Sequence, residues 1–133
     1  MKISACITNS FRSNEITVST EANLKDMTID TKADGYGLSV NGGELLFLSL
    51  ATCFCNDLYR EAKKENVEIS AVKISVSGEF GGEGESARNI FYEVSVEAPA
   101  MTPEEISALI KKVDQIAEIH HTLRKGIEVK LLS

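Results

Sequence analysis

Apolar and polar residues alternate along several stretches of the chain, which predicts β-strands. In residues 2–9 the apolar side chains fall on one face, namely Ile3, Ala5 and Ile7. A period of two with one apolar side is typical of a strand that buries one face, and we expect that here. Shorter apolar alternations at residues 16–18 and 27–29 predict two further short strands.

Two longer alternating stretches, residues 72–76 and 90–96, lie on either side of a glycine-rich and acidic segment, residues 78–85. This arrangement predicts an antiparallel hairpin with a glycine-rich tip. A last alternation at residues 127–131 predicts a final strand at the end of the chain.

The pattern changes between these strands, where residues 43–65 predict one long helix. Residues 45–55 carry no charge, whereas residues 56–65 are strongly polar. A helix that is apolar all round is buried on every side. One sheet of so small a domain gives too little cover for such a helix, so we expect the partner subunit of a homodimer to supply the rest.

A second helix is predicted from Thr102. Threonine caps a helix, proline fits the first helical position, and Glu105 stands where it closes a capping box. Apolar residues then recur at helical spacing as far as Ala117, and Gly126 ends the region. The expected order is therefore β-β-β-α-β-β-α-β, a single α+β domain over residues 1–133.

Composition and charge exclude several classes of protein. The chain has 133 residues and a net charge of −6, with no run of Lys or Arg longer than two. A basic patch for nucleic acid or an anionic membrane is therefore disfavoured. Residues 45–55 are too short to span a bilayer, and the N-terminus lacks the apolar region of a secretion signal, so we expect a cytoplasmic protein. Three cysteines make a disulfide framework improbable.

Two of the cysteines, Cys53 and Cys55, lie in the long helix. Residues two apart on a helix point to roughly opposite faces, so a disulfide between them requires unwinding. The face of Cys53 changes from apolar to polar at that point and could open to a pocket, where Arg60 could favour a thiolate. Cys55 shares its face with core-type residues. A packed, unreactive thiol remains the alternative for each.

The two adjacent histidines are the remaining candidates for chemistry. His120 continues the apolar series of the second helix and should point inward, whereas His121 should point elsewhere. The spacing of the cysteines and histidines matches no common zinc pattern, so we expect no metal and no other cofactor. A buried histidine with a hydrogen-bond partner fits the position of His120 better.

The segment Asn-Gly-Gly-Glu-Leu-Leu-Phe-Leu-Ser-Leu-Ala-Thr-Cys, which ends at Cys53, resembles the stretch Pro-x-Glu-Leu-Leu-x-x-x-Leu-x-x-Cys of OsmC/Ohr-like proteins, the osmotically induced and organic hydroperoxide resistance proteins. The resemblance covers most of the chain. It implies an α+β fold built as an intertwined homodimer, with two equivalent sites at the interface. By this resemblance, Cys53 attacks a hydroperoxide as a thiolate, Glu44 matches the glutamate of the motif, and Arg12 is the candidate activating arginine.

The chain departs from the family pattern at two positions. Where the second cysteine of the family lies, this chain reads Ala-Glu-Ile-His-His-Thr-Leu, so Ala117 occupies the place of the resolving cysteine. Gly43 stands where the organic-hydroperoxide branch has its essential glutamate. Glu44 is also about half a helical turn out of phase with Cys53, and it could serve the helix N-terminus instead.

Three hypotheses follow. The first is a hydroperoxide reductase that uses Cys53 and an external thiol, with Cys55, Arg60 and His120 as further binding residues. The second is a catalytically degenerate dimer that binds a small apolar ligand or a protein partner. The third is a metal or persulfide-type site made by Cys53 and His120. A depressed pKa of Cys53 favours the first hypothesis, and a normal or raised pKa of a buried thiol favours the second.

Overall fold

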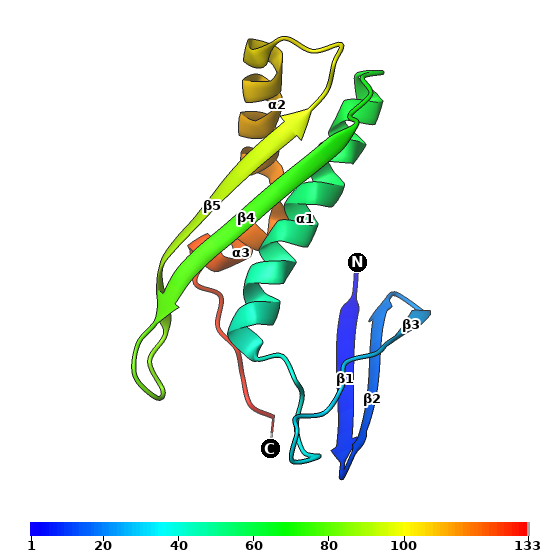
Figure 1. Cartoon of the computed structure of the whole chain (residues 1–133), viewed down its shortest axis with the longest axis vertical. Helices are drawn as coiled ribbons and strands as arrows, with labels where there is room; N and C mark the ends of the chain where they lie inside the picture. The colour runs from blue at the N-terminus through cyan, green and yellow to red at the C-terminus, as the bar shows by residue number, and fades with distance from the viewer. Residues whose placement is uncertain (133) are drawn as a thin grey trace. The chain divides into compact units, whose positions relative to one another are not determined.

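The computed structural model describes residues 1–132, and it has the predicted α+β composition, with antiparallel sheets and three helices (Figure 1). The chain divides into two compact units, Met1–Glu44 and Leu45–Ser133. That residues 1–133 form a single domain stays a prediction.

The first unit contains a three-stranded antiparallel sheet in the order β1-β2-β3. Its strands are β1 (Ile3–Ser10), β2 (Ser13–Thr20) and β3 (Asn23–Met27), which confirms the first two predicted strands, whereas the third ends at Met27 and does not extend over the predicted residues 27–29. The predicted burial of one face of β1 is wrong, because Ile3 and Ile7 are 67% and 51% exposed. Alternation defines the two faces of a strand, but it does not supply an element that covers either of them.

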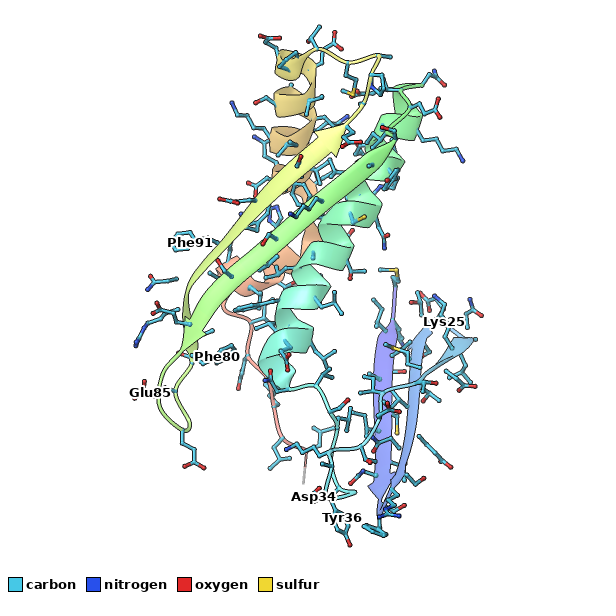
Figure 2. The ribbon with its side chains drawn as sticks, in the orientation of Figure 1. Lys25, Asp34, Tyr36, Phe80, Glu85 and Phe91 are labelled. Atoms are coloured by element: carbon cyan, nitrogen blue, oxygen red, sulfur yellow. The ribbon has the colours of Figure 1, made fainter. Side chains whose placement is uncertain are left out.

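The second unit contains the predicted hairpin of β4 (Ala71–Phe80) and β5 (Ala87–Glu97), which pair antiparallel. Its glycine-rich tip includes Glu85, and Phe91 lies on the outer face of β5 (Figure 2). The inner face packs against the core through the residues that alternate along the two strands: Val72, Ile74, Tyr92, Val94 and Val96.

The long helix α1 (Gly42–Lys64) matches the prediction to within one residue at each end. Its core-facing side includes Phe54, Leu58 and Ala62. In the chain by itself the helix is not buried on every side, because Leu48 and Tyr59 are 59% and 43% exposed. The two-stranded hairpin and the C-terminal helices cover only one side of α1 (Figure 1). The dimer partner expected to cover the other side stays a prediction.

The predicted second helix is two helices, α2 (Pro103–Ile116) and α3 (Glu118–Lys125). Thr102 and Glu105 form the predicted capping box at the start of α2, and Gly126 ends α3 in the left-handed conformation. Between the helices Ala117 is extended, with φ −65° and ψ 113°, and it is fully buried. The apolar spacing predicted which residues point inward, but it did not reveal this change of direction.

The final strand predicted at residues 127–131 is absent, since no β-structure follows Gly126 as far as residue 132. Val129 and Leu131 are 95% and 96% exposed. A strand forms only where a neighbouring strand accepts its backbone hydrogen bonds, and the described part of this chain offers this segment none. Among residues 1–132, no helix is both long enough and apolar enough to cross a membrane.

Candidate functional site

Cys53 lies in the middle of α1, where the side of the helix changes from apolar to polar. The thiol is half-buried and packs against the edge of the core. One turn further along the helix, Asp57 is 6% exposed and places its carboxylate beside the thiol, with 3.9 Å between Cys53 Sγ and Asp57 Oδ2. The thiol therefore donates a weak hydrogen bond to a buried carboxylate.

The start of α3 faces the same thiol. The N-cap residue of α3, Ala117, has no side-chain oxygen to accept from the first backbone N–H groups of the helix. The backbone N–H groups of Ile119 and Glu118 favour negative charge on the sulfur, which lowers the pKa of Cys53. The extended backbone of Ala117 starts a new helix at this point, and that helix end supplies the sulfur with donors that a continuous helix would lack.

The net electrostatic effect on Cys53 is unfavourable for a thiolate. Burial is the largest influence and raises the pKa of Cys53 above its ordinary value, the negative charge of Asp57 raises it further, and the N–H groups of α3 only partly oppose them. The thiol is therefore mainly protonated at neutral pH. Of the sequence-based hypotheses, this direction favours the ligand- or partner-binding dimer.

Arg60 binds carboxylates and not the thiol. Its Nη1 lies 2.9 Å from Asp57 Oδ1, and its Nε donates to Glu61 Oε2 at 3.2 Å. The guanidinium of Arg60, which the sequence suggested could favour a thiolate, is thus paired with two neighbouring carboxylates. A binding role of Arg60 toward a substrate stays a prediction.

Glu44 and Arg12 have local partners of their own. Glu44 and Asn41 form a reciprocal cap at the start of α1, at 2.9 and 2.8 Å, which agrees with the alternative that Glu44 serves the helix N-terminus. Glu44 is nine residues before Cys53, a rise of roughly 13 Å along the helix. Arg12 sits in the turn between β1 and β2, with its guanidinium 5.0 Å from the ring centre of Phe11. Roles of both in peroxide chemistry stay predictions.

The remaining candidates are Cys55, which is half-buried, and His120, which is 4% exposed. Cys55 is absent from the core cluster in which the sequence analysis placed it. His120 points inward as predicted, but the expected hydrogen-bond partner is missing, because neither ring nitrogen has one among the described residues. In residues 1–132 no group of three or more His, Cys, Asp or Glu side chains is arranged to hold a metal ion.

Sequence analysis missed a polar network next to His120. Tyr92 on β5 donates its hydroxyl hydrogen to Asp114 on α2, and Arg124 on α3 binds the same carboxylate oxygen at 2.8 Å. Burial and the contact with Asp114 raise the pKa of Tyr92 to about 12. No sequence signal could have found these residues, because they come from three elements that meet only in the folded unit.

The position of Asp57 leads to a test of the thiol environment. In an Asp57→Asn variant we expect iodoacetamide to alkylate Cys53 about fivefold faster at neutral pH, because two unit charges about 4 Å apart interact by roughly 1 kcal/mol even in water. The substitution also frees Arg60 from its partner at 2.9 Å. Peptide mapping of alkylated protein across a pH series measures the rate at Cys53 alone.

The exposed carboxylate of Glu79, in the hairpin, provides the matched control. Glu79→Gln should leave the alkylation rate of Cys53 unchanged. An Asp57→Asn variant with the wild-type pH profile would show that the carboxylate does not influence the sulfur.

Comparison with solved structures shows the same fold in bacterial proteins. An OsmC-like protein from Mycoplasma pneumoniae is 18% identical, with a TM-score of 0.64 over 94% of this chain and 87% of that one. An organic hydroperoxide resistance protein from Elizabethkingia anophelis is 20% identical, with a TM-score of 0.60 over 98% and 94%. A third, described as an organic hydroperoxide resistance protein OsmC and predicted redox protein from Legionella pneumophila, is 17% identical, with a TM-score of 0.58 over 98% and 95%.

No match was found among curated proteins. The family model described as OsmC-like protein, however, matches residues 34–132, which include Cys53, the hairpin and all of α2 and α3. A match over most of the chain, with the same fold in solved members, shows that this chain belongs to the OsmC-like protein family.

Proposed function

We propose that this chain is a one-cysteine hydroperoxide reductase that works as a homodimer and uses Cys53 with an external thiol. The observation that carries the proposal is the placement of one half-buried thiol, hydrogen-bonded to Asp57, at the start of α3, where helix N–H groups can hold the negative charge of a thiolate. Family membership supports it, as do the structural neighbours that are named organic hydroperoxide resistance proteins.

In the first step Cys53 loses its proton to the solvent, and the thiolate attacks the terminal oxygen of the hydroperoxide. The S–O bond forms as the O–O bond breaks, so sulfur loses two electrons and the peroxide gains them. The departing alkoxide takes a proton and leaves as an alcohol. The N–H groups of Glu118 and Ile119 stabilise the negative charge on sulfur before the attack.

An external thiol then resolves the sulfenic acid. Its sulfur attacks Cys53 Sγ, water leaves, and a mixed disulfide forms, which a second thiol reduces to free Cys53 and an external disulfide. Resolution within the chain is disfavoured because the methyl group of Ala117 stands at the family position of the second cysteine. Cys53, Cys55 and Cys6 are all free, and Cys55 lies two residues from Cys53 on the same helix.

The homodimer is proposed from the uncovered apolar side of α1. Leu48 and Tyr59 are exposed in the chain by itself, and so is the apolar segment after Gly126. Burying these side chains against a second copy removes apolar surface from water, which is the main favourable contribution to association. A cytoplasmic location, where external thiols stay reduced, fits the same mechanism.

Trapping of the sulfenic acid tests the mechanism directly. We expect one equivalent of cumene hydroperoxide in the presence of dimedone to label Cys53 and leave Cys55 unlabelled, as read by peptide mass spectrometry. Because burial raises the pKa of the Cys53 thiol above its ordinary value, the labelling rate should still be increasing as the pH rises from 7 to 9. Absence of the Cys53 adduct at every pH would exclude the reductase.

A second function is favoured by the raised pKa of Cys53 and the missing sulfur at Ala117. In that case the chain is a non-enzymatic OsmC-like dimer that binds a small apolar ligand or a protein partner. The two functions differ in one result, because only the reductase forms a sulfenic acid on Cys53.

A further inference from the structure

A small cavity opens beside His120 in the second unit. It has a volume of about 220 Å³ and is lined by residues of α1, β5 and α3: Leu50, Ile90, Tyr92, His120, Leu123 and Arg124. An apolar cavity of roughly 150 Å³ holds one benzene molecule, so this one admits a ring with one or two further atoms. Cys53 is not among the lining residues.

His120 is an unusual residue to line this cavity, because it is buried and its ring nitrogens are unpaired within residues 1–132. Its ring packs against Phe54 and Tyr92, with centroid separations of 5.6 and 4.9 Å, and only 4% of the residue is exposed. Neither ring nitrogen has a hydrogen-bond partner among the described residues. A buried polar group without a partner is destabilising, which calls for a group that the chain itself does not provide.

The other polar side chains of the cavity are already paired. Arg124 binds Asp114 at 2.8 Å, and the hydroxyl of Tyr92 donates to the same carboxylate. The positive charge of Arg124 is therefore balanced, and only the imidazole is left to recognise a ligand. Burial is the main influence that lowers the pKa of His120, so the ring is neutral at pH 7 and carries one donor and one acceptor.

We propose that this cavity binds a neutral, ring-sized apolar molecule with one hydroxyl group, and that His120 recognises the hydroxyl. A hydroxyl is both donor and acceptor, as is a neutral imidazole, whereas a carboxylate would find no unpaired positive charge. The two imidazole orientations related by a half-turn about the Cβ–Cγ bond have the same outline with carbon and nitrogen positions exchanged, and the ligand selects the orientation that presents a nitrogen to it. The proposal does not depend on peroxide reduction by Cys53.

Benzyl alcohol and toluene form a matched pair of probes, because they differ only by one hydroxyl group. In NMR titrations of the full chain, labelled with ¹⁵N at histidine, we expect benzyl alcohol to shift the ring nitrogens of His120. It should bind about 2- to 12-fold more tightly than toluene, the equivalent of one net hydrogen bond. Benzoate, which is similar in size but charged, should bind more weakly than benzyl alcohol.

Variants assign the effect to the imidazole. His120→Phe keeps a ring of similar size and should reduce the affinity for benzyl alcohol to that for toluene. His121→Phe, which replaces the exposed neighbouring histidine, should change neither affinity. Cys53→Ser should retain full binding, so a failure of the thiol chemistry is distinguished from a failure of this site.

Two results would overturn the proposal. Equal affinities for benzyl alcohol and toluene in the wild type would exclude recognition of the hydroxyl. A benzyl alcohol titration that leaves the ring nitrogens of His120 unshifted would show that the cavity is filled in solution, for example by the second copy of the chain, or that the ligand binds elsewhere.

Discussion

A Cys53→Ser variant is expected to consume organic hydroperoxide, with a dithiol as reductant, no faster than protein-free buffer. Serine has nearly the same shape, so the packing of the half-buried side chain is preserved. Its hydroxyl does not ionise near neutral pH, and oxygen cannot form the sulfenic acid on which the proposed cycle depends. Loss of a catalytic nucleophile typically removes at least about a hundredfold of the rate, and often far more.

Cys55→Ser is the matched control for this loss. Cys55 lies two residues further along α1, is also half-buried, and has no place in the proposed cycle. We therefore expect it to keep at least about half of the wild-type rate. If Cys55→Ser removed the activity and Cys53→Ser did not, the reactive thiol would be Cys55, and the environment of Cys53 would be purely structural.

A Phe54→Ala variant is expected to lose about 3–5 kcal/mol of unfolding free energy, the usual range for a fully buried phenylalanine. Phe54 is fully buried, and the centroid of its ring lies 5.1 Å from that of Tyr92 and 5.6 Å from that of His120. The truncation removes contacts to a strand and to α3 at once, and leaves a cavity at the centre of the second unit. Urea denaturation at a fixed protein concentration measures the change.

Phe91 supplies a control of the same residue type. It lies on the outer face of β5 and is 66% exposed (Figure 2). Phe91→Ala should cost less than about 1 kcal/mol, since exposed side chains bury little apolar surface. Equal losses for the two variants would show that the outer face of the hairpin is covered in solution, as it would be in a larger interface than the one proposed along α1.

Local sequence signals predicted most of the elements correctly. The capping box at Thr102, the left-handed end at Gly126 and the long helix α1 each depend on a few neighbouring residues. The same is true of the hairpin, because alternating residues on both sides of a glycine-rich tip favour that structure without help from the rest of the chain. Cys53 was found as a candidate from the change of polarity on its own helix face.

The predictions that failed concern strands, burial and side-chain partners that depend on residues far apart in the sequence. The strand expected at residues 127–131 has the right alternation but no neighbouring strand among the described residues. The face of β1 that was expected to be buried is exposed in the single chain, since apolar character does not create a covering element. Arg60 was expected to act on the thiol, but the carboxylates nearest to it, Asp57 and Glu61, bind it instead.

By itself the sequence determined the α+β class, the family resemblance, the reactive-cysteine candidate and the absence of a second cysteine at Ala117. Only the tertiary structure decided the environment of that cysteine, with Asp57 on one side and the start of α3 on the other. It also decided that His120 has no partner in the wall of a cavity. The physical reason is that secondary structure follows from neighbouring residues, whereas burial and electrostatics depend on which elements meet in the folded unit.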